Sequence, residues 1–461
     1  MEYQVETTAS DYHWLSASLK NLPAIKALQG CLDDEVELFM PVDCERPDRL
    51  RADGIWLLSG TIDGQPVAVG WWDFRVKGGS FGRSVCRRFL AFLRAVEQRH
   101  QPLLLVVNSL GLRFMEGRTI FADVFGLIPA LLRFKRRQLL VTACQGRCLG
   151  FGALVFGLGH YRLAAGTGAT LSLTGPEVFQ LFFGQRIAFS EVAATEAEYH
   201  RSGLIHELPD RLGDMMMRAA YVLKYLGGDR PLPAIPYEEV APGQALTVSS
   251  LLQALGGRAL EVFPGYDSRL QAFVAELGGR RLGVLLNPPG QVNNMFAFRS
   301  LVLYREALQL FRALRLPLLV LLDTPGVDPR FDGQNQRVLE QLLSVTEEVI
   351  NYPYRKMGVV IGRGFGGANS LGMPKVYGAE ATYGLAGLQL GVMHHSIIEQ
   401  LLSGSAPLLA QWNAARAEEK DDCSDVVEAG ILDGIISIDG LAGVVMKTLF
   451  ATSPPPLMEV G

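Results

Sequence analysis

The sequence predicts an α/β protein with two related halves, and three observations support this prediction. Buried apolar strands alternate with helices along the chain, an order typical of sheets with largely parallel strands. Both halves carry a strand-end turn followed by a glycine-rich turn. The proline-rich stretch 229–258 separates the halves and is typical of an interdomain linker. We therefore expect an N-terminal domain at 1–228 and a C-terminal domain at 259–461.

Composition narrows the class of protein. Of the 461 residues, 49% are hydrophobic, which is enough for more than one buried core. The net charge of -4 argues against a nucleic-acid-binding protein, which would usually be basic. The first residues lack a basic region followed by an apolar run, and polar Gln145 and Arg147 interrupt the apolar stretch 138–158. We therefore expect neither a secretory signal nor a membrane span.

The cysteines point to a reducing compartment. The six cysteines form no CxxC pair, which argues against a zinc ribbon. No metal is expected, and a reduced cytoplasmic chain fits this pattern best.

The elements of the first half follow from periodicity and turn residues. Residues 1–50 are expected to form a helical lead-in. Asp63-Gly64 between apolar runs predicts a hairpin within 51–70. A helix is expected at 84–97, and buried strands are expected at 103–107 and 139–144.

The second half repeats this order. Strands are expected at 281–286, 318–323 and 357–361, with a helix at 298–314. Gly150 follows Asn108 by 42 positions, and Gly366 follows Asp323 by 43. The similar spacing and matching order of elements indicate a duplicated domain.

Each half contains a buried strand that ends in glycines before a helix. Such a turn frees backbone N–H groups at a helix N-terminus, where they and the helix dipole stabilise an oxyanion. The alternatives are tight helix–strand packing and a binding site for a cofactor phosphate. The first turn is Gly150-Phe151-Gly152, and the second is Gly366-Gly367-Ala368.

Six short motifs are specific when taken together and in order. The first three are Gly78-Gly79-Ser80-Phe81-Gly82, the turn that begins at Asn108-Ser109-Leu110-Gly111, and Thr174-Gly175-Pro176-Glu177-Val178. The last three are Asp323-Thr324-Pro325-Gly326, Arg363-Gly364-Phe365-Gly366-Gly367-Ala368-Asn369 and Gly391-Val392-Met393. In this order they resemble the carboxyltransferase β subunits of acyl-CoA carboxylases over residues 30–450.

The resemblance implies two tandem crotonase-like domains of the ββα-spiral type. It also implies that each glycine turn binds a different oxyanion. Gly150, Phe151 and Gly152 would hold the thioester carbonyl as an enolate. Gly366, Gly367 and Ala368 would hold the ureido oxygen of biotin. A ring nitrogen of biotin takes the α-proton in that family, so no protein base is needed. This fits the sequence, which offers no Ser-His-Asp set and no paired carboxylates at a matching position.

The resemblance also implies substrates and partners. The substrate would be a coenzyme A or acyl-carrier-protein thioester, and biotin would arrive on a separate carrier protein from a separate biotin carboxylase. The chain would form a homo-oligomer whose sites join the N-domain of one chain to the C-domain of another, such as a hexamer, or a hetero-oligomer. No nucleic acid or membrane partner is implied. The substrate-binding residues would be Gly78, Gly79, Ser80, Gly111, Arg113, Gly175, Pro176, Asn369 and Ser370.

Several positions depart from the family pattern. Phe151 replaces a glycine of the first turn and adds bulk, and the turn 146–152 is similar to one in the β subunit of biotin-independent malonate decarboxylase. Asn108 replaces an Asp, Leu110 replaces a Gly, and Ser370 leaves the acyl-chain length open. A biotin-independent malonyl-thioester decarboxylase and a noncatalytic paralogue therefore stay open as alternatives.

Two charged groups allow two interpretations each. Arg113 either pairs with Glu116 within the chain or contacts the substrate. The basic run 133–137 is either solvated surface or a site for coenzyme A phosphates or an acidic carrier protein.

Four further residues are expected to be structural. His394 and His395 are interpreted as satisfied histidines, and Cys148 as a small buried hydrophobe. Lys447 lies in a tetrapeptide like that of biotinylated proteins, but a terminal helix is expected there in place of a carrier domain.

Overall fold

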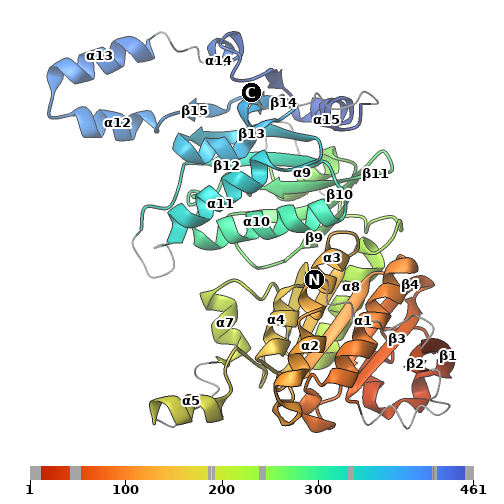
Figure 1. Cartoon of the computed structure of the whole chain (residues 1–461). Coiled ribbons are helices and arrows are strands. Elements are labelled where there is room, and N and C mark those ends of the chain that lie inside the picture. The colour runs from red at the N-terminus through yellow and green to blue at the C-terminus, as the bar shows by residue number, and fades with distance from the viewer. Residues whose placement is uncertain are drawn as a thin grey trace. The chain divides into compact units, whose positions relative to one another are not determined.

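The computed structural model divides the chain into two compact units, residues 1–230 and 231–461 (Figure 1). Each unit is built on its own eight-stranded sheet. The structure describes residues 12–41, 53–184, 188, 193–237, 245–330, 337–417, 419 and 423–451.

The sheet of the first unit changes from antiparallel to parallel pairing. Its strand order is β1-β2-β3-β4-β5-β6-β7, with β8 paired to the end of β6. Pairing is antiparallel from β1 to β4 and parallel from β4 to β7. The strands are β1 Tyr12–Ser18, β2 Glu35–Pro41, β3 Ile55–Ile62, β4 Gln65–Trp72, β5 Leu103–Ser109, β6 Leu140–Leu149, β7 Tyr161–Ala164 and β8 Thr170–Ser172.

Helices pack on this sheet through apolar faces. Within α1, Val85, Phe89 and Phe92 are fully buried, and Phe89 meets Trp72 of β4 edge to face. The α-helices are α1 Arg83–Gln98, α2 Phe121–Val124, α3 Leu127–Lys135, α4 Phe151–Gly157, α5 Pro176–Phe183, α7 Thr195–Arg201 and α8 Leu212–Leu226. The 3-10 helices are η2 Leu19–Asn21, η3 Pro23–Leu28, η5 Lys77–Gly79 and η6 Phe114–Ile120.

The second unit repeats this plan. Its strand order is β16-β14-β13-β12-β11-β10-β9, with β15 paired to the end of β13. Strands β9 to β11 pair antiparallel, and β11 to β14 pair parallel. The strands are β9 Arg258–Val262, β10 Gln271–Leu277, β11 Arg280–Leu286, β12 Leu318–Thr324, β13 Lys356–Phe365, β14 Ala381–Leu385, β15 Gln389–Gly391 and β16 Gly434–Ile436.

The helices of the second unit also follow the first. The long helix α10 has 16 residues, as α1 has. The α-helices are α9 Val248–Ala254, α10 Phe298–Ala313, α11 Val338–Ile350, α12 His395–Leu402, α13 Ala406–Arg416, α14 Ser424–Glu428 and α15 Leu441–Leu449. The 3-10 helices are η8 Gly366–Gly372, η9 Lys375–Tyr377 and η10 Ile438–Gly440.

The sheet register supports the predicted duplication. Between β5 and β6 the pairing moves from Val107–Cys144 to Ser109–Cys148. Between β12 and β13 it moves from Leu322–Val360 to Thr324–Gly364. Both shifts therefore advance two residues on one strand and four on the other. Such bulges re-aim the backbone at a strand end, next to the glycine turns.

Most of the predicted elements are confirmed. The hairpin turn forms at Asp63 and Gly64, both at positive φ, which matches the twist of the flanking strands. Lys447 lies in the terminal helix α15, as expected. Within the described part of the chain, no helix has both the length and the apolar character that a bilayer crossing requires.

The helical lead-in predicted for residues 1–50 is wrong where the structure describes it. Residues 12–18 and 35–41 form β1 and β2, joined by 3-10 turns, while 1–11 and 42–50 lie outside the described residues. The segment 35–41 pairs with β1 on one side and with β3 on the other, and it buries Val36 and the run from Leu38 to Met40.

The stretch 229–258 contains a folded helix as well as prolines. Leu251, Leu252 and Leu255, in and just after α9, belong to the hydrophobic core of the second unit, with Phe273 and Met357. Residues 238–244 of this stretch lie outside the described residues.

Candidate functional site

In the first unit, the Gly78-Gly79 turn packs directly on the end of β5. A Cβ atom on Gly79 would overlap the carbonyl oxygen of Asn108, and one on Gly78 would overlap the Leu110 side chain. Both glycines have positive φ, which other residues rarely adopt. The Leu110 N–H donates to the Gly78 carbonyl at 2.9 Å. The glycines therefore allow two backbone segments to touch at this site.

The glycine turn at the end of β6 presents backbone N–H groups. Gly150 has φ 54° and ψ -121°, a conformation that only glycine adopts easily, and its own N–H donates to the Ser172 carbonyl at 2.9 Å. Helix α4 begins at Phe151, so the N–H groups of Phe151 and Gly152 have no partner within the helix. No other acceptor for them is found among the described residues. Unpaired N–H groups at the start of a helix can stabilise an anion.

Gly111 keeps the space in front of this turn open. It has φ 95°, and a Cβ atom there would lie 3.2 Å from the Leu149 carbonyl oxygen and 3.5 Å from the Phe151 nitrogen. The Ser109 hydroxyl accepts the Gly111 N–H at 3.0 Å and holds the turn in place. Gly111 is thus brought next to the Phe151 amide by the bulge at the end of β5.

The Phe151 side chain points into the core. It is 8% exposed and meets Phe81 edge to face with ring centroids 5.1 Å apart. Phe81 in turn packs on Trp72. The bulk that distinguishes Phe151 from the family's glycine is therefore accommodated between the turn and the helix–sheet core.

The second unit builds a matching turn at the end of β13. Gly366 has φ 60°, and η8 begins there. Gly367 is exposed, nothing lies within 4 Å of its Cβ position, and Ala368 is buried. The Ser370 hydroxyl donates to the Gly367 carbonyl at 2.7 Å, and Asn369 packs against Gly364. Ser370 and Asn369 therefore shape the turn itself.

The two turns share their supporting contacts. Thr324 Oγ1 accepts the Gly326 N–H at 3.2 Å, as Ser109 accepts that of Gly111. The Arg363 N–H donates to Asp323 Oδ1 at 2.9 Å, and the Arg147 N–H donates to Asn108 Oδ1 at 3.0 Å. The duplicated bulge therefore places an Asp or Asn at the same point under each turn.

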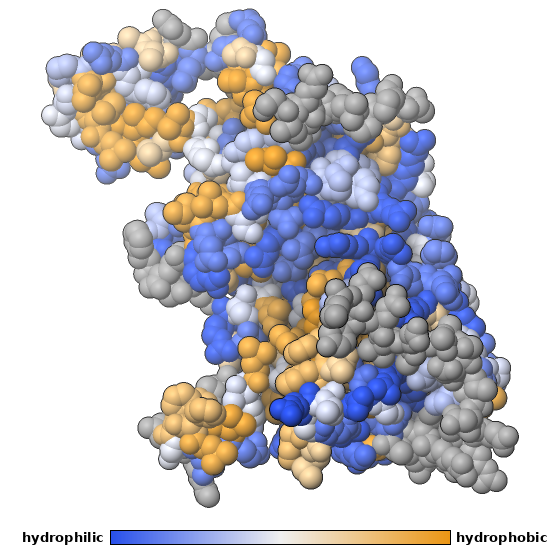
Figure 2. All heavy atoms as spheres, viewed as in Figure 1, coloured by the Kyte–Doolittle hydropathy of each residue, from blue (hydrophilic) through white to orange (hydrophobic). Residues whose placement is uncertain are grey.

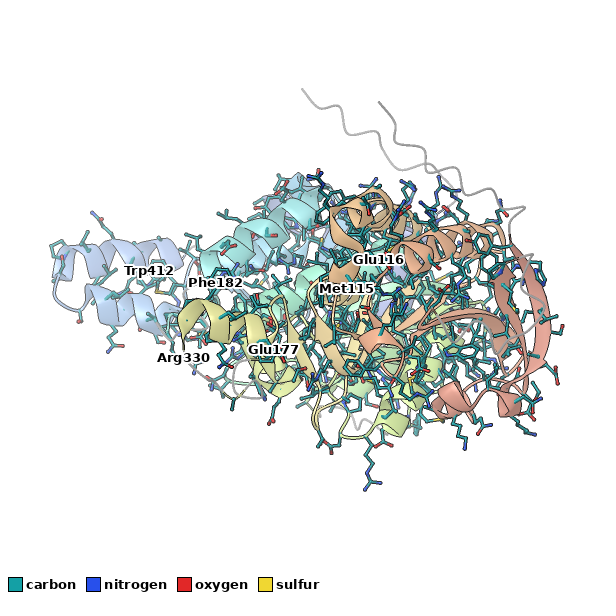
Figure 3. All side chains as sticks on the ribbon, turned by 60° about the horizontal axis from the view of Figure 1, so that its bottom comes forward. Met115, Glu116, Glu177, Phe182, Arg330 and Trp412 are labelled. Atoms are coloured by element: carbon teal, nitrogen blue, oxygen red, sulfur yellow. The ribbon has the colours of Figure 1, made fainter. Side chains whose placement is uncertain are left out.

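Arg113 forms an ion pair with Glu116 within the chain, which is the first of the two interpretations that the sequence left open. Its Nη1 lies 3.2 Å from Glu116 Oε1, and its Nη2 donates to the Ser80 carbonyl at 2.9 Å. Glu116 also accepts the Arg83 N–H at the start of α1. Glu116 lies beside Met115, whose side chain is strongly exposed (Figure 3). The pair ties the Gly78–Ser80 segment to the turn after β5.

Gly175 and Pro176 begin an exposed helix. Gly175 is the N-cap and Pro176 the first residue of α5, a helix without a buried residue. The preceding strand β8 pairs with β6, and its Ser172 accepts the Gly150 N–H. The two residues are thus linked to the first turn through β8.

The residues expected to be structural are engaged in the fold. Cys148 is fully buried, and burial raises the pKa of its thiol. His394 caps α12, and its Nδ1 lies 2.7 Å from the Ser396 hydroxyl. The basic run 133–137 precedes β6, about 30 Å of strand away from the turn that follows it. Arg137 of this run pairs with Glu97.

Two features were not recognised in the sequence. Arg147 lies exposed beside the first turn, and its neighbour Asn108 is 39 positions away in sequence. Helix α13 and the exposed face of α5 carry apolar side chains that a periodicity argument would assign to a core. The Asn–Arg contact could have been found only by aligning the two halves on their bulges.

Comparison with known proteins agrees with this arrangement. Residues 34–403 match the carboxyl transferase domain family. The methylmalonyl-CoA carboxyltransferase 12S subunit of Propionibacterium freudenreichii subsp. shermanii is 24% identical over 373 residues, which cover 74% of this chain and 68% of that subunit. The propionyl-CoA carboxylase beta chain of Saccharopolyspora erythraea is 22% identical over 422 residues, which cover 83% of this chain and 73% of that one.

Solved structures share the fold. Transcarboxylase 12S with methylmalonyl-coenzyme A and methylmalonic acid bound gives a TM-score of 0.75 at 20% identity, over 89% of this chain and 84% of that chain. This likeness confirms the predicted α/β fold of two tandem crotonase-like domains. The match spans most of the described residues of both units, and the chain belongs to the carboxyl transferase domain family.

Proposed function

We propose that this chain is the carboxyltransferase component of a biotin-dependent acyl-CoA carboxylase, which moves a carboxyl group to the α-carbon of an acyl thioester. One observation carries the proposal. Each unit ends a bulged parallel strand in a glycine at positive φ, Gly150 or Gly366, and then begins a helix whose first N–H groups are unpaired within it. A reaction that passes through two oxyanions needs two such sites.

The first turn is assigned to the thioester. The N–H groups of Phe151 and Gly152 would donate to the thioester oxygen as it gains negative charge on enolisation. Gly111 leaves room for that oxygen beside the Phe151 amide. Gly78, Gly79 and Ser80 would line the same substrate, because their segment packs on the turn that contains Gly111.

The second turn is assigned to biotin. The exposed Gly367, with its open Cβ position, would let a flat ring approach the backbone N–H groups of Gly367 and Ala368. When bound, carboxybiotin supplies the carboxyl group and then a ring nitrogen that accepts the α-proton. The chain's own contribution is to hold the ureido oxygen and orient the ring.

The side chains around both turns support a reaction without a protein base. The Cys148 thiol is buried, and burial raises its pKa, so it is a poor nucleophile and is not available as a thiolate base. His394 caps α12, and its Nδ1 lies 2.7 Å from the Ser396 hydroxyl. The α-proton would then pass to the substrate-borne nitrogen.

Relatives guide the choice of substrates and partners. Curated relatives are called propionyl-CoA carboxylase beta chain and biotin-dependent acetyl-/propionyl-coenzyme A carboxylase beta5 subunit. We therefore infer acetyl-CoA or propionyl-CoA as acceptor, with a separate biotin carboxylase and a biotin carrier as partners. The described cysteines form no disulfide with one another, which is typical of proteins in the reducing cytoplasm.

Exposed apolar helices support a homo-oligomer. Leu181 and Phe182 on α5 are 84% and 81% exposed, and Leu401 on α12 is 69% exposed. Figure 2 shows apolar residues gathered over α5 and over α12 and α13, and Figure 3 marks Phe182 on α5 and Trp412 on α13. Such patches mark interaction sites. The structurally similar transcarboxylase 12S is a hexamer assembly.

The proposal is tested by mass-spectrometric turnover of malonyl-CoA with and without free biotin. Acetyl-CoA formed only with biotin is the expected result. Equal formation without biotin would favour a malonyl-thioester decarboxylase, the function suggested by the similarity of the turn 146–152 to the malonate decarboxylase β subunit. No turnover with malonyl-CoA, methylmalonyl-CoA or a malonyl-carrier protein would favour a noncatalytic subunit.

A further inference from the structure

The two units place one arginine at the same point of their bulges, but in different charge environments. In the second unit, Arg363 Nε donates to Asp323 Oδ1 at 2.8 Å, and Nη2 donates to Oδ2 at 3.3 Å. The Arg363 side chain is only 23% exposed. Its charge is therefore neutralised by a two-point ion pair.

In the first unit, Asn108 takes the place of Asp323. Asn108 Oδ1 accepts the Arg147 N–H as Asp323 accepts that of Arg363, so the backbone geometry is kept. Asparagine has nearly the shape of aspartate but carries no charge. No carboxylate within the described ranges lies at ion-pair distance from Arg147. Its guanidinium stands 5.9 Å over the ring of Phe74 and is exposed.

Arg147 borders the proposed thioester site. Arg147 precedes Gly150 by three residues, about 10 Å of strand. Phe74 belongs to the loop between β4 and the Gly78-Gly79 turn. Arg147 therefore borders two of the segments that form the first turn.

We propose that Arg147 binds an oxyanion of the thioester substrate. This inference rests on the proposed function, because it takes an acyl thioester as the ligand. A guanidinium presents a fork of donors that fits carboxylate and phosphate groups, and an aromatic ring beneath it holds it in place. The oxyanion is either a carboxylate on the acyl group or a phosphate of coenzyme A.

The test is calorimetric binding to the full-length protein. The ligands are malonyl-CoA, acetyl-CoA and the phosphate-free malonyl-N-acetylcysteamine thioester. Arg147→Gln should weaken binding of the recognised ligands by about 10- to 100-fold, the usual strength of a charge-assisted hydrogen bond. Loss for both malonyl ligands but not for acetyl-CoA identifies a carboxylate. Loss for both CoA ligands but not for the phosphate-free thioester identifies a phosphate.

A double-mutant cycle tests the electrostatic cause. Asn108→Asp restores the ion pair seen in the second unit and should weaken binding about as much as Arg147→Gln. In the double variant Asn108→Asp/Arg147→Gln the carboxylate has no arginine partner, so its repulsion of an anionic ligand should weaken binding further. Unchanged binding in Arg147→Gln or in Asn108→Asp would overturn the inference. The control is Arg94→Gln, an exposed arginine in the C-terminal half of α1, which should bind every ligand as wild type does.

Biotin-dependent turnover of the same variants separates this inference from the proposed function. Binding that depends on Arg147 without any biotin-dependent transfer would contradict the function and keep the inference. Normal transfer with unaltered binding in Arg147→Gln would contradict the inference alone.

Discussion

Replacing Gly150 by alanine should impair the oxyanion hole proposed at the first turn without filling it. The nearest atoms to an added Cβ are Gly111 Cα at 3.6 Å and the Leu173 carbonyl oxygen at 3.8 Å, both ordinary contacts. The φ of 54° and ψ of -121° are nevertheless strongly unfavourable for alanine. We expect the turn to relax and to move the N–H groups of Phe151 and Gly152 away from the thioester oxygen.

The magnitude follows from two known effects. Backbone strain of this kind costs about 1–3 kcal/mol when it is retained, and it lowers the free energy of unfolding by that amount. If the turn relaxes and one oxyanion donor is lost, kcat falls by about 100- to 1,000-fold. Either way, the variant should lose kcat, stability or both. The assay is biotin-dependent decarboxylation of malonyl-CoA, with thermal unfolding of the same samples.

Gly157→Ala provides the matched control on the same helix. Gly157 is the last residue of α4, its φ is not positive, and the nearest atom to an added Cβ is Leu204 Cδ1 at 3.8 Å. This variant should keep kcat and stability, or gain a little stability. A Gly150→Ala protein with wild-type kcat and wild-type unfolding would refute the reasoning.

The remaining predictions concern stability, reactivity and assembly. Burial lowers the pKa of Lys356 from 10.5 to about 8, so between these values the unfolded state binds more protons and stability rises with pH. Denaturant titrations measure the free energy of unfolding of the wild type and of Lys356→Met. The wild-type value minus the variant value should rise by about 3 kcal/mol between pH 7 and 10.5, and a value that does not change with pH would contradict this. Cys148 should resist iodoacetamide in the native protein at pH 8, because burial raises the pKa of its thiol, and Cys148→Ala should keep its activity. Peptide mass spectrometry that finds the native thiol alkylated would contradict this prediction. Phe182→Glu should lower the mass measured by light scattering, whereas an unchanged mass would exclude α5 from the interface.

The sequence predicted the parts of the fold that burial and turn chemistry dictate. Strands such as β5 and β12 are continuous apolar runs because both faces are covered, and glycines mark where they end. The order of strands, helices and glycine turns along the chain was enough to predict the duplicated sheets and both glycine turns.

Other features depend on contacts that sequence patterns do not contain. The strands β1 and β2 were missed because neither shows the strict alternation of buried and exposed side chains that predicts a strand: β1 is mostly half-buried, and β2 buries three residues in a row. The direction of the Phe151 ring depends on Phe81, which is 70 positions away. The charge state around Arg147 depends on Asn108, which meets it only through the bulge.

The most direct test of the central claim, that the two turns divide the reaction, is to measure kcat/KM separately for malonyl-CoA and for free biotin in Gly150→Ala and Gly366→Ala. A Cβ atom on Gly366 would lie 3.3 Å from the Val392 carbonyl oxygen at φ 60°, so this variant perturbs only the second turn. Because a loss of kcat lowers kcat/KM for both substrates, the dissociation constants of the two ligands are measured as well. We predict that Gly366→Ala mainly weakens binding of biotin and that Gly150→Ala mainly weakens binding of malonyl-CoA. Equal weakening of both ligands in both variants, or turnover that ignores biotin, would contradict the account.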